Sequence, residues 1–186
     1  MELLASCWLA IVATAAAVWF YGALAWMALP HHKKDFKQLP DDTKVMDFVR
    51  SLNIEPGVYG YPNMHCDGEN REKMKQIWET GPMGMLTLWK KPNMGVNMAL
   101  TFLVNLAASF LIAYVGVAAG FVRGEAFAKV FQVLATVGIL TYSVASLPNA
   151  IWFQANKRAV VSCLIDGVMM GLITGVMMGW LWPKSV

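Results

Sequence analysis

Four long apolar runs alternate with polar segments along this chain, and their lengths predict its architecture. The first run covers 3–29 without a charged residue, and the others cover 94–119, 126–147 and 160–182. A transmembrane helix needs about 20 mostly apolar residues to cross the roughly 30 Å hydrocarbon core of a bilayer. Each run is long enough, so we predict an all-α membrane protein with four transmembrane helices.

The first apolar run is interpreted as a retained helix and not as a cleaved signal peptide. Its apolar part is longer than the roughly 7–15 residues of a signal peptide, and only Glu2 precedes it where a basic segment is expected. Trp8 and Trp26 lie near its two ends, as is typical of aromatic belts at membrane interfaces. We therefore count this run as the first span.

The extended polar segment, 30–93, follows the first span and is predicted to form short amphipathic helices on the cytoplasmic side. Asp41 offers an N-cap, and apolar side chains follow it at helical spacing: Val45, Phe48, Val49 and Leu52. Asp67 can cap a second short helix. The stretch 53–62 is rich in glycine and proline and predicts an ordered loop. The apolar stretch 83–89 is too short to span, so we expect it to lie along the membrane interface.

Four glycines recur at every fourth position of the last apolar run: Gly167, Gly171, Gly175 and Gly179. This spacing lines bare backbone along one side of a helix. Lipid tails gain little from such a groove, whereas a neighbouring helix can approach it closely. We predict that these glycines are helix-contact residues, packed against another helix of this chain or of a partner.

Polar residues inside the spans are candidate functional groups, because polar side chains are costly in lipid. In the second run Asn97, Thr101, Asn105 and Ser109 recur every fourth residue, and we expect this seam to face protein. Asp166 lies about two turns inside the last run. It is either a site for a proton or cation, or a structural group that hydrogen-bonds Asn97, Asn149 or a serine. Both interpretations stay open.

Composition agrees with a membrane protein, since 57% of the 186 residues are hydrophobic and the mean hydropathy is +0.47. Soluble domains have about 45–50% apolar residues. The small formal charge of +3 does not favour a nucleic-acid partner. Basic residues flank the spans mostly on the side of 30–93, so we expect that segment in the cytoplasm and both termini outside a bacterial inner membrane. Lipid-headgroup contact is expected for His31, His32, Lys33, Lys34, Lys90 and Lys91.

Two histidine-containing clusters raise the question of a metal site. Met64 precedes His65, Cys66 and Asp67, and the pair His31–His32 lies at the membrane edge. Neither cluster has the ligand spacing of a structural zinc motif, and adjacent residues in an extended chain point apart. We therefore predict no metal site and no cofactor.

The chain carries no recognisable catalytic motif. The three cysteines, Cys7, Cys66 and Cys163, are far apart and form no disulfide framework. The chain contains no G-x-S-x-G, H-E-x-x-H or phosphate-loop motif, and no paired haem histidines within its spans. We therefore do not expect an enzyme.

Three motifs in the first half of the chain carry a resemblance. They are Trp26-Met27-Ala28-Leu29-Pro30-His31-His32-Lys33, Pro56-Gly57-Val58-Tyr59-Gly60 and Gly81-Pro82-Met83-Gly84. Together they resemble a family of small bacterial four-helix integral-membrane proteins that have a large loop after the first helix and no assigned activity. The resemblance implies a bacterial membrane protein and carries over no functional residue.

Helix-contact chemistry without catalytic chemistry predicts a non-enzymatic accessory or scaffold subunit of a membrane complex. Its expected partners are the lipid bilayer and other membrane subunits or further copies of the chain, associated through the glycine groove. The alternative hypothesis is a small homo-oligomeric transporter or proton-linked permease that uses Asp166. The discriminating observation is whether Asp166 lines a cavity or is sealed in a helix contact.

Overall fold

The structure is a computed structural model that describes residues 2–63 and 69–185. It divides into two compact units. One unit consists of Met1–Gln38 and Gly95–Val186 and is helical, and the other consists of Leu39–Met94. The candidate site lies entirely within the helical unit.

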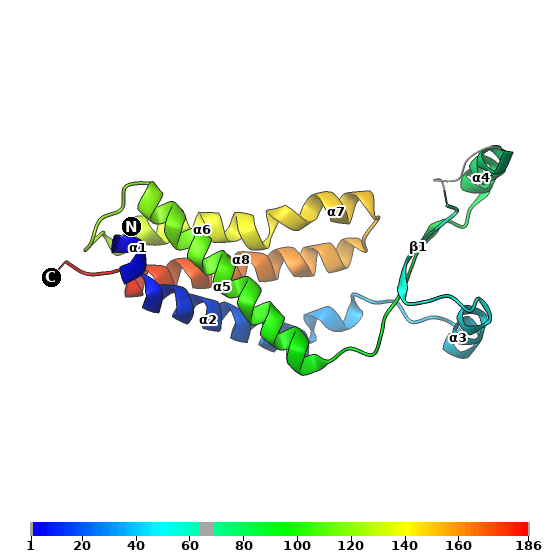
Figure 1. Ribbon diagram of the computed structural model, residues 1–186, viewed down its shortest axis with the longest axis horizontal. Helices are drawn as coiled ribbons and strands as arrows, with labels where there is room; N and C mark the ends of the chain where they lie inside the picture. The colour runs from blue at the N-terminus through cyan, green and yellow to red at the C-terminus, as the bar shows by residue number, and fades with distance from the viewer. Residues whose placement is uncertain (1, 64–68, 186) are drawn as a thin grey trace. The chain divides into compact units, whose positions relative to one another are not determined.

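Within the described residues, four helical stretches are long and apolar enough to cross a membrane. They are α2 (Trp8–Met27), α5 (Met94–Ala118), the stretch Phe127–Trp152 and α8 (Lys157–Leu181). Figure 1 shows α6 and α8 side by side and α5 crossing the bundle. The prediction of four apolar helices is therefore confirmed, and the fold is compatible with a multi-pass membrane protein.

Two of the predicted apolar runs contain breaks that the apolar pattern did not show. A short helix α1 (Glu2–Ser6) precedes α2, with a turn at Cys7 between them. The third stretch continues beyond the expected end at 147 and consists of α6 (Phe127–Tyr142), the 3₁₀ turn η2 (Val144–Ser146) and α7 (Leu147–Trp152). Its proline occupies the first turn of α7, where a missing N–H breaks no helical hydrogen bond.

The glycines of α8 lie against α6, and Gly171 shows how closely. A Cβ atom on Gly171 would lie 2.5 Å from the backbone nitrogen of Ile139, closer than real Cβ atoms come to such a neighbour. Gly138 of α6 faces the same point, since a Cβ there would lie 2.9 Å from the Cα of Gly171. Both helices therefore contribute bare backbone to the contact.

The other three glycines of the series extend this contact along α8. A Cβ on Gly167 would lie 2.6 Å from the carbonyl oxygen of Tyr142, and one on Gly175 would lie 2.6 Å from the Cβ of Ala135. A Cβ on Gly179 would meet the ring of a phenylalanine in the first turn of α6, at 2.7 Å. The glycine groove of α8 is thus filled by α6 of the same chain.

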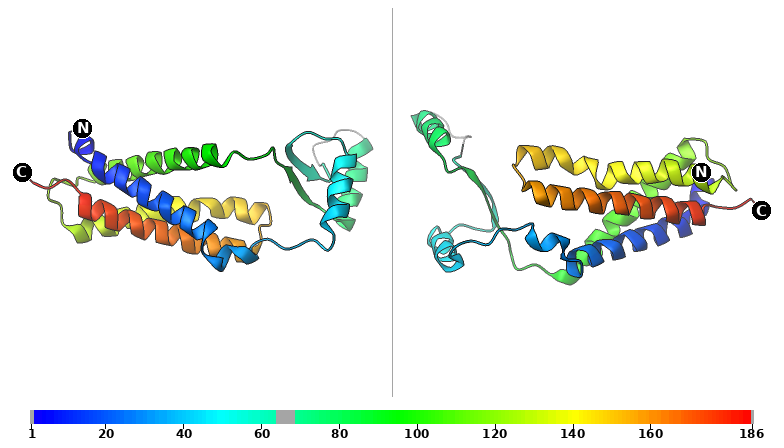
Figure 2. Two further views of the ribbon diagram at one scale, coloured as in Figure 1. Left: turned by 90° about the horizontal axis from the view of Figure 1, so that it is seen from below. Right: turned by 180° about the vertical axis from the view of Figure 1, so that it is seen from behind.

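The apolar core gathers at the end of the bundle where both termini lie (Figure 2). It includes side chains from α2, α5, α6 and α8, among them Ile11, Ile112, Leu134, Met178 and Trp182. The indole N–H of Trp182 donates to the carbonyl oxygen of Val122 at 3.0 Å, which anchors the chain after α8. The opposite end of the bundle holds the polar groups described below.

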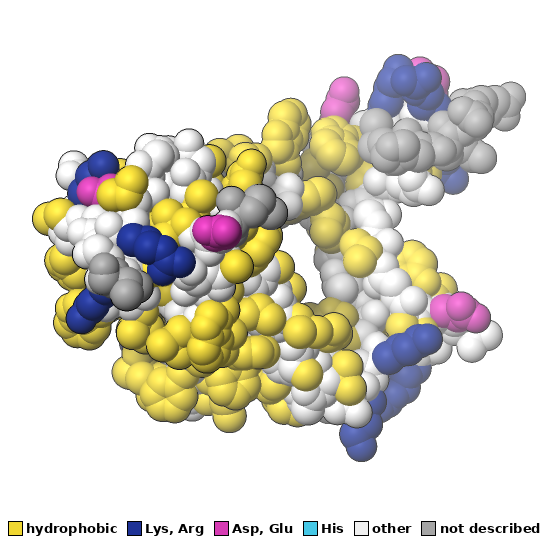
Figure 3. All heavy atoms as spheres, turned by 60° about the vertical axis from the view of Figure 1, so that its left-hand side comes forward, with side chains coloured by type: hydrophobic (Ala, Val, Ile, Leu, Met, Phe, Trp, Pro, Cys, Tyr) yellow, Lys and Arg dark blue, Asp and Glu magenta, His cyan; other side chains and the backbone are white. Residues whose placement is uncertain are grey.

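The outer surface of the helical unit is apolar, as Figure 3 shows for one face. Large hydrophobic side chains are exposed on all four long helical stretches, among them Phe20, Val104, Leu140, Trp152 and Ile165. Apolar surface of this extent suits contact with lipid. The observation supports the expected bilayer contact.

The second unit contains two helices and two strands within its described residues. These are α3 (Asp42–Ser51), β1 (Gly57–Tyr61), α4 (Glu69–Thr80) and β2 (Gly84–Leu88). Asp41 caps α3 by accepting a hydrogen bond from the Lys44 backbone N–H at 3.1 Å. Asp67, the expected cap of the second helix, lies outside the described residues.

The two strands depart from the expected all-α fold. Strand β1 pairs antiparallel with β2, with Gly57 opposite Leu88 and Tyr61 opposite Gly84. The sequence pattern predicted a loop over 53–62 and an interfacial segment over 83–89. The strands were not predicted because each one's hydrogen-bond partner is the other strand, which lies beyond α4 in the sequence. Neither segment shows this pairing alone.

Candidate functional site

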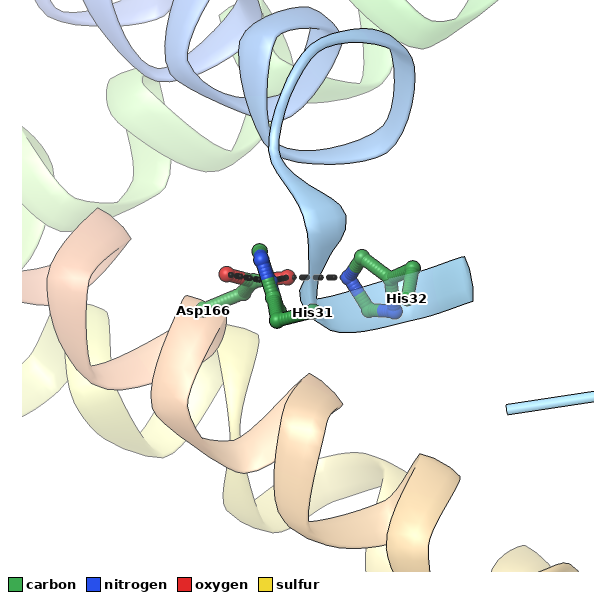
Figure 4. Close-up of side chains that lie close together, drawn as sticks. All are labelled: His31, His32 and Asp166. Carbon is green, nitrogen blue, oxygen red and sulfur yellow. Dashed lines mark hydrogen bonds and ion pairs between the residues drawn. The ribbon is translucent and has the colours of Figure 1, made fainter. Parts of the chain in front are cut away.

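A sharp change of direction after α2 brings two successive histidines to face α8. Helix α2 ends at Met27, Leu29 is extended, and Pro30 starts the 3₁₀ turn η1 (Pro30–Lys34). Proline suits this first turn because its fixed φ fits a helix start and its missing N–H has no partner to lose. Figure 4 shows the side chains of His31 and His32 on this turn directed at Asp166 of α8.

Three side chains contact the carboxylate of Asp166. Nε2 of His31 lies 3.0 Å from Oδ1 and 3.3 Å from Oδ2, and Nε2 of His32 lies 2.6 Å from Oδ2. The hydroxyl of Tyr21, near the end of α2, donates to Oδ1 at 2.9 Å. Asp166 is 4% exposed, so these contacts provide the hydrogen bonds that a buried carboxylate requires.

His32 links Asp166 to a second carboxylate. Its Nδ1 lies 2.6 Å from Oδ2 of Asp35, which follows η1 directly. The imidazole stacks on the indole of Trp26 with ring centroids 3.9 Å apart and an interplanar angle of 8°. His32 is 5% exposed, so its ring is held from both edges and one face.

Asp35 is in turn held by groups at the start of α8. The hydroxyl of Ser162 donates to Oδ1 at 3.2 Å, and Nε of Arg158 lies 3.8 Å from the same oxygen. The side-chain amide of Asn156, the N-cap of α8, donates to the Asp35 backbone oxygen at 2.9 Å. These contacts tie the turn after α2 to the beginning of α8.

The charged forms of His32, Asp35 and Asp166 stabilise one another. Burial lowers the pKa of His32, but its hydrogen bonds and proximity to Asp35 and Asp166 outweigh burial, so the pKa lies above the usual range. The hydrogen bond from His32, with smaller contributions from Ser162 and Arg158, lowers the pKa of Asp35. The arrangement therefore favours an imidazolium whose two N–H groups each donate to a carboxylate.

An open pocket of about 570 Å³ reaches the cluster. Its polar lining consists of Tyr21, His31, Lys157, Arg158, Ser162 and Asp166, and its apolar lining consists of Leu29, Val161 and Ile165. The His31 side chain is 30% exposed and that of Asp166 is 6% exposed. A small solute in the pocket would therefore meet His31 first and the carboxylate behind it.

The structure separates the expected polar residues into two groups. Asp166 and Asn105 are buried, whereas Asn97, Thr101 and Asn149 are exposed. Asp166 hydrogen-bonds Tyr21 and the two histidines, not the asparagines or serine that the structural interpretation expected.

The two histidines were expected at lipid headgroups, and the structure corrects this for His32. Its ring is buried between two carboxylates, which leaves almost no surface for a headgroup. The lysines of the basic segments, Lys33, Lys34, Lys90 and Lys91, are exposed, and their headgroup contact stays a prediction.

Tyr21 and Asp35 were not predicted as site residues from the sequence. Asp35 stands three residues after His32, a spacing that brings side chains together on a helical turn, so this partner had a detectable signal. Tyr21 carried no such signal in the sequence, because nothing in its position distinguished it from the other aromatic residues of the first apolar run.

In the described part of the chain, one group of histidine, cysteine or acidic side chains has convergent metal-ligand atoms. It comprises His31, His32 and Asp166, whose ligand atoms lie within 4.8 Å of one another. His65 and Cys66, the other residues considered for a metal, lie outside the described residues.

Comparisons with protein-family models, curated proteins and solved structures found no match. The resemblance to small bacterial membrane proteins therefore stays a prediction, and the function is argued from the geometry of the site.

Proposed function

We propose that the protein is a small membrane transporter for a cation, a proton or a metal ion, with Asp166 at its binding centre. The observation that carries the proposal is that this carboxylate belongs to a membrane-length helix and lines an open pocket. Ionisable groups within a span are costly and mark ion or proton pathways in many membrane proteins.

A break in the neighbouring helix supports the proposal. Helix α6 ends at Tyr142, and the hydroxyl of Ser143 then donates to the Leu164 backbone oxygen of α8 at 3.0 Å. Gly167, which packs against this break, directly follows Asp166. Interrupted helices beside a polar residue are typical of binding sites in secondary transporters.

Buried hydroxyl groups also lie within the bundle. Thr14 of α2, Ser109 of α5 and Thr174 of α8 are each 0% exposed. Among the described residues, the hydroxyl of Thr14 has no hydrogen-bond partner, and the neighbouring hydroxyls of Ser109 and Tyr142 make no hydrogen bond of ordinary geometry. Thr174 lies about two helical turns beyond Asp166, towards the end of the bundle that holds the termini. These groups offer hydrogen bonds to an ion or water inside the bundle.

The accessory-subunit hypothesis has lost part of its motivation. It relied on the glycine groove of α8 as a surface for a partner helix. Since α6 of the same chain fills that groove, the glycines explain internal packing and do not point to another subunit. The polar centre at Asp166 also holds η1 against α8, but unlike the glycine groove it opens on a pocket, which favours transport.

We also propose that the protein lies in a bacterial inner membrane with both termini outside and residues 30–93 in the cytoplasm. The support is the distribution of basic residues beside the span ends. In this orientation the pocket at Asp166 opens near the cytoplasmic end of the bundle.

Flux measurements in reconstituted liposomes test the transport function. Proton entry is followed with an internal pH dye and Zn²⁺ entry with an internal zinc dye. We expect flux of one of these cations through the parent protein and its loss in Asp166→Asn, because the variant keeps the side-chain shape but removes the charge. The variant should still show a cooperative melting transition, at a lower temperature than the parent, since an amide cannot replace the contacts of the carboxylate with both histidines. Asp47→Asn is the matched control, since Asp47 is an exposed carboxylate paired with Arg50 in the other unit. Equal flux through the parent protein and Asp166→Asn, or no flux of either cation through the parent protein, would overturn the proposal.

A further inference from the structure

We propose that His31, His32 and Asp166 bind a divalent transition-metal ion of the Zn²⁺ class. The inference names the cation of the transporter proposed above and rests on that proposal for its physiological role. The site itself stands on the geometry of three side chains and the groups that orient them.

The ligand atoms converge from two elements that are far apart in the sequence. Nε2 of His31 and Nε2 of His32 come from η1, and the carboxylate of Asp166 comes from α8 (Figure 4). Zinc bonds to nitrogen and oxygen of about 2.1 Å place neighbouring ligands of a tetrahedral ion about 3.4 Å apart. The His31–Asp166 separations of 3.0 and 3.3 Å are already close to this value.

The other ligand atoms need only small shifts to reach tetrahedral spacing. Nε2 of His32 lies 2.6 Å from Oδ2 of Asp166, so these two atoms have to move apart as the ion enters. The most widely separated ligand atoms of the group, at most 4.8 Å apart, have to move closer together. The His31 side chain can supply the closing movement because it is 30% exposed at the pocket. The ion also displaces the proton that His32 shares with Asp166, as metal binding to histidine generally requires.

Asp35 supplies a second and independent observation. Histidines that bind metal almost always donate their other ring N–H to a carboxylate or carbonyl, which fixes the tautomer and the ring orientation. Nδ1 of His32 lies 2.6 Å from Asp35, which leaves Nε2 directed at Asp166. Stacking on Trp26 and the Ser162 hydroxyl bond to Asp35 hold this orientation.

The type and number of ligands indicate the class of ion. Imidazole nitrogen suits Zn²⁺ and its neighbours, whereas Mg²⁺ and Ca²⁺ prefer oxygen ligands alone. Three protein ligands leave one position of a tetrahedral ion free, as in exchangeable and catalytic zinc sites. The pocket reaches His31 and Asp166, so an ion can enter and a fourth ligand can bind from that side.

Zinc titration of the full chain in detergent tests the site. The protein is first stripped with a chelator and then titrated with Zn²⁺ in competition with a chromophoric zinc indicator, with Mg²⁺ in excess. We expect one tightly bound Zn²⁺ per chain and its loss in His32→Ala and in Asp166→Asn. His65→Ala is the matched control, because His65 is the third of the three histidines in the chain.

The positioning role of Asp35 gives a graded prediction in the same titration. Removal of a carboxylate that orients a histidine ligand typically costs about 10–100-fold in metal affinity. Asp35→Asn should therefore weaken Zn²⁺ binding by about that factor while the stoichiometry stays at one per chain. Asp47→Asn should leave the affinity unchanged.

X-ray absorption at the zinc edge of the parent protein identifies the ligands even if a variant fails to fold. We expect only nitrogen and oxygen neighbours near 2.0–2.2 Å. A sulfur neighbour near 2.3 Å would place the ion at Cys66 or another cysteine and overturn the assignment. Absence of stoichiometric Zn²⁺ binding, or its loss in His65→Ala with retention in His32→Ala, would overturn it as well.

The two proposals fail in different ways. Stoichiometric Zn²⁺ at this site without flux of either cation through liposomes supports the metal site and overturns transport. Proton flux that depends on Asp166, in a chain that binds no Zn²⁺, supports transport and overturns the metal site.

Discussion

Single residues decide how closely α6 and α8 pack. Gly171 and Gly138 face each other, and their missing side chains let the two backbones meet. His32 has an equally specific environment, because both ring nitrogens bond carboxylates and one face stacks on Trp26. In both places a larger or less polar side chain would leave its neighbours without their present contacts.

Replacement of Gly171 tests the contact between α6 and α8. Replacement of Gly171 by Leu inserts a side chain where the backbone of Ile139 leaves no room, and overpacking of this kind typically costs about 1–3 kcal/mol. We expect a lower melting temperature in detergent. Met169→Leu on the exposed side of α8 is the control and should melt like the parent. A Gly171→Leu protein with the parent's melting temperature would show that α6 does not fill the groove.

At the scale of elements, the turn η1 and the break between α6 and α7 shape the site. The η1 turn directs two successive histidines at one carboxylate, which a continuous α2 would not do. The break frees Ser143 to bond the Leu164 backbone oxygen of α8, two residues before Asp166. Both irregular elements lie at the polar end of the bundle, opposite the apolar core.

The pairing of β1 with β2 is testable by cross-linking. Val58 lies opposite Thr87, and directly opposed residues of an antiparallel pair have Cα atoms about 4.5–5.5 Å apart, within the range for a disulfide. Val58→Cys with Thr87→Cys should therefore form a disulfide on mild oxidation, detected by mass spectrometry after cleavage within α4. The native cysteines Cys7, Cys66 and Cys163 are first replaced by alanine.

A matched pair controls for random collision. Successive side chains of a strand point to opposite faces, so Val58→Cys with Leu86→Cys should cross-link much less. Equal yields from the two pairs would contradict the register.

At the scale of the whole molecule, the even number of spans in the described residues places both termini at one end of the bundle. The basic residues near the ends of the apolar helices then predict the orientation. On the side expected to be cytoplasmic they are Lys33, Lys34, Lys37, Lys44, Lys90, Lys91, Lys157 and Arg158, against Arg123, Lys129 and Lys184 on the other side.

The orientation predicts the behaviour of reporter fusions. A fluorescent protein that folds only in the cytoplasm should stay dark at the C-terminus and become bright when fused after Lys91 in a truncated chain. Alkaline phosphatase should show the reverse pattern, because it is active only outside the cytoplasm. A bright C-terminal fusion would show that the positive-inside bias does not govern this chain.

The sequence by itself determined the four apolar helices and the spacing of the glycines along the last one. Both are local properties, since the length of an apolar run and a spacing of four residues can be seen within a single segment of the sequence. The N-cap at Asp41 and the unusual position of Asp166 inside a span were visible for the same reason.

Only the tertiary structure decided which groups meet. His32 and Asp166 are separated by 134 positions, and their contact depends on α2 packing beside α8 and on the turn at Pro30. In the sequence the histidines stood beside lysines and resembled a solvated basic cluster. The strands of the second unit were hidden likewise, because a strand's hydrogen-bond partner lies on another segment. Local patterns specify which surfaces each element presents, and packing alone specifies which surfaces come together.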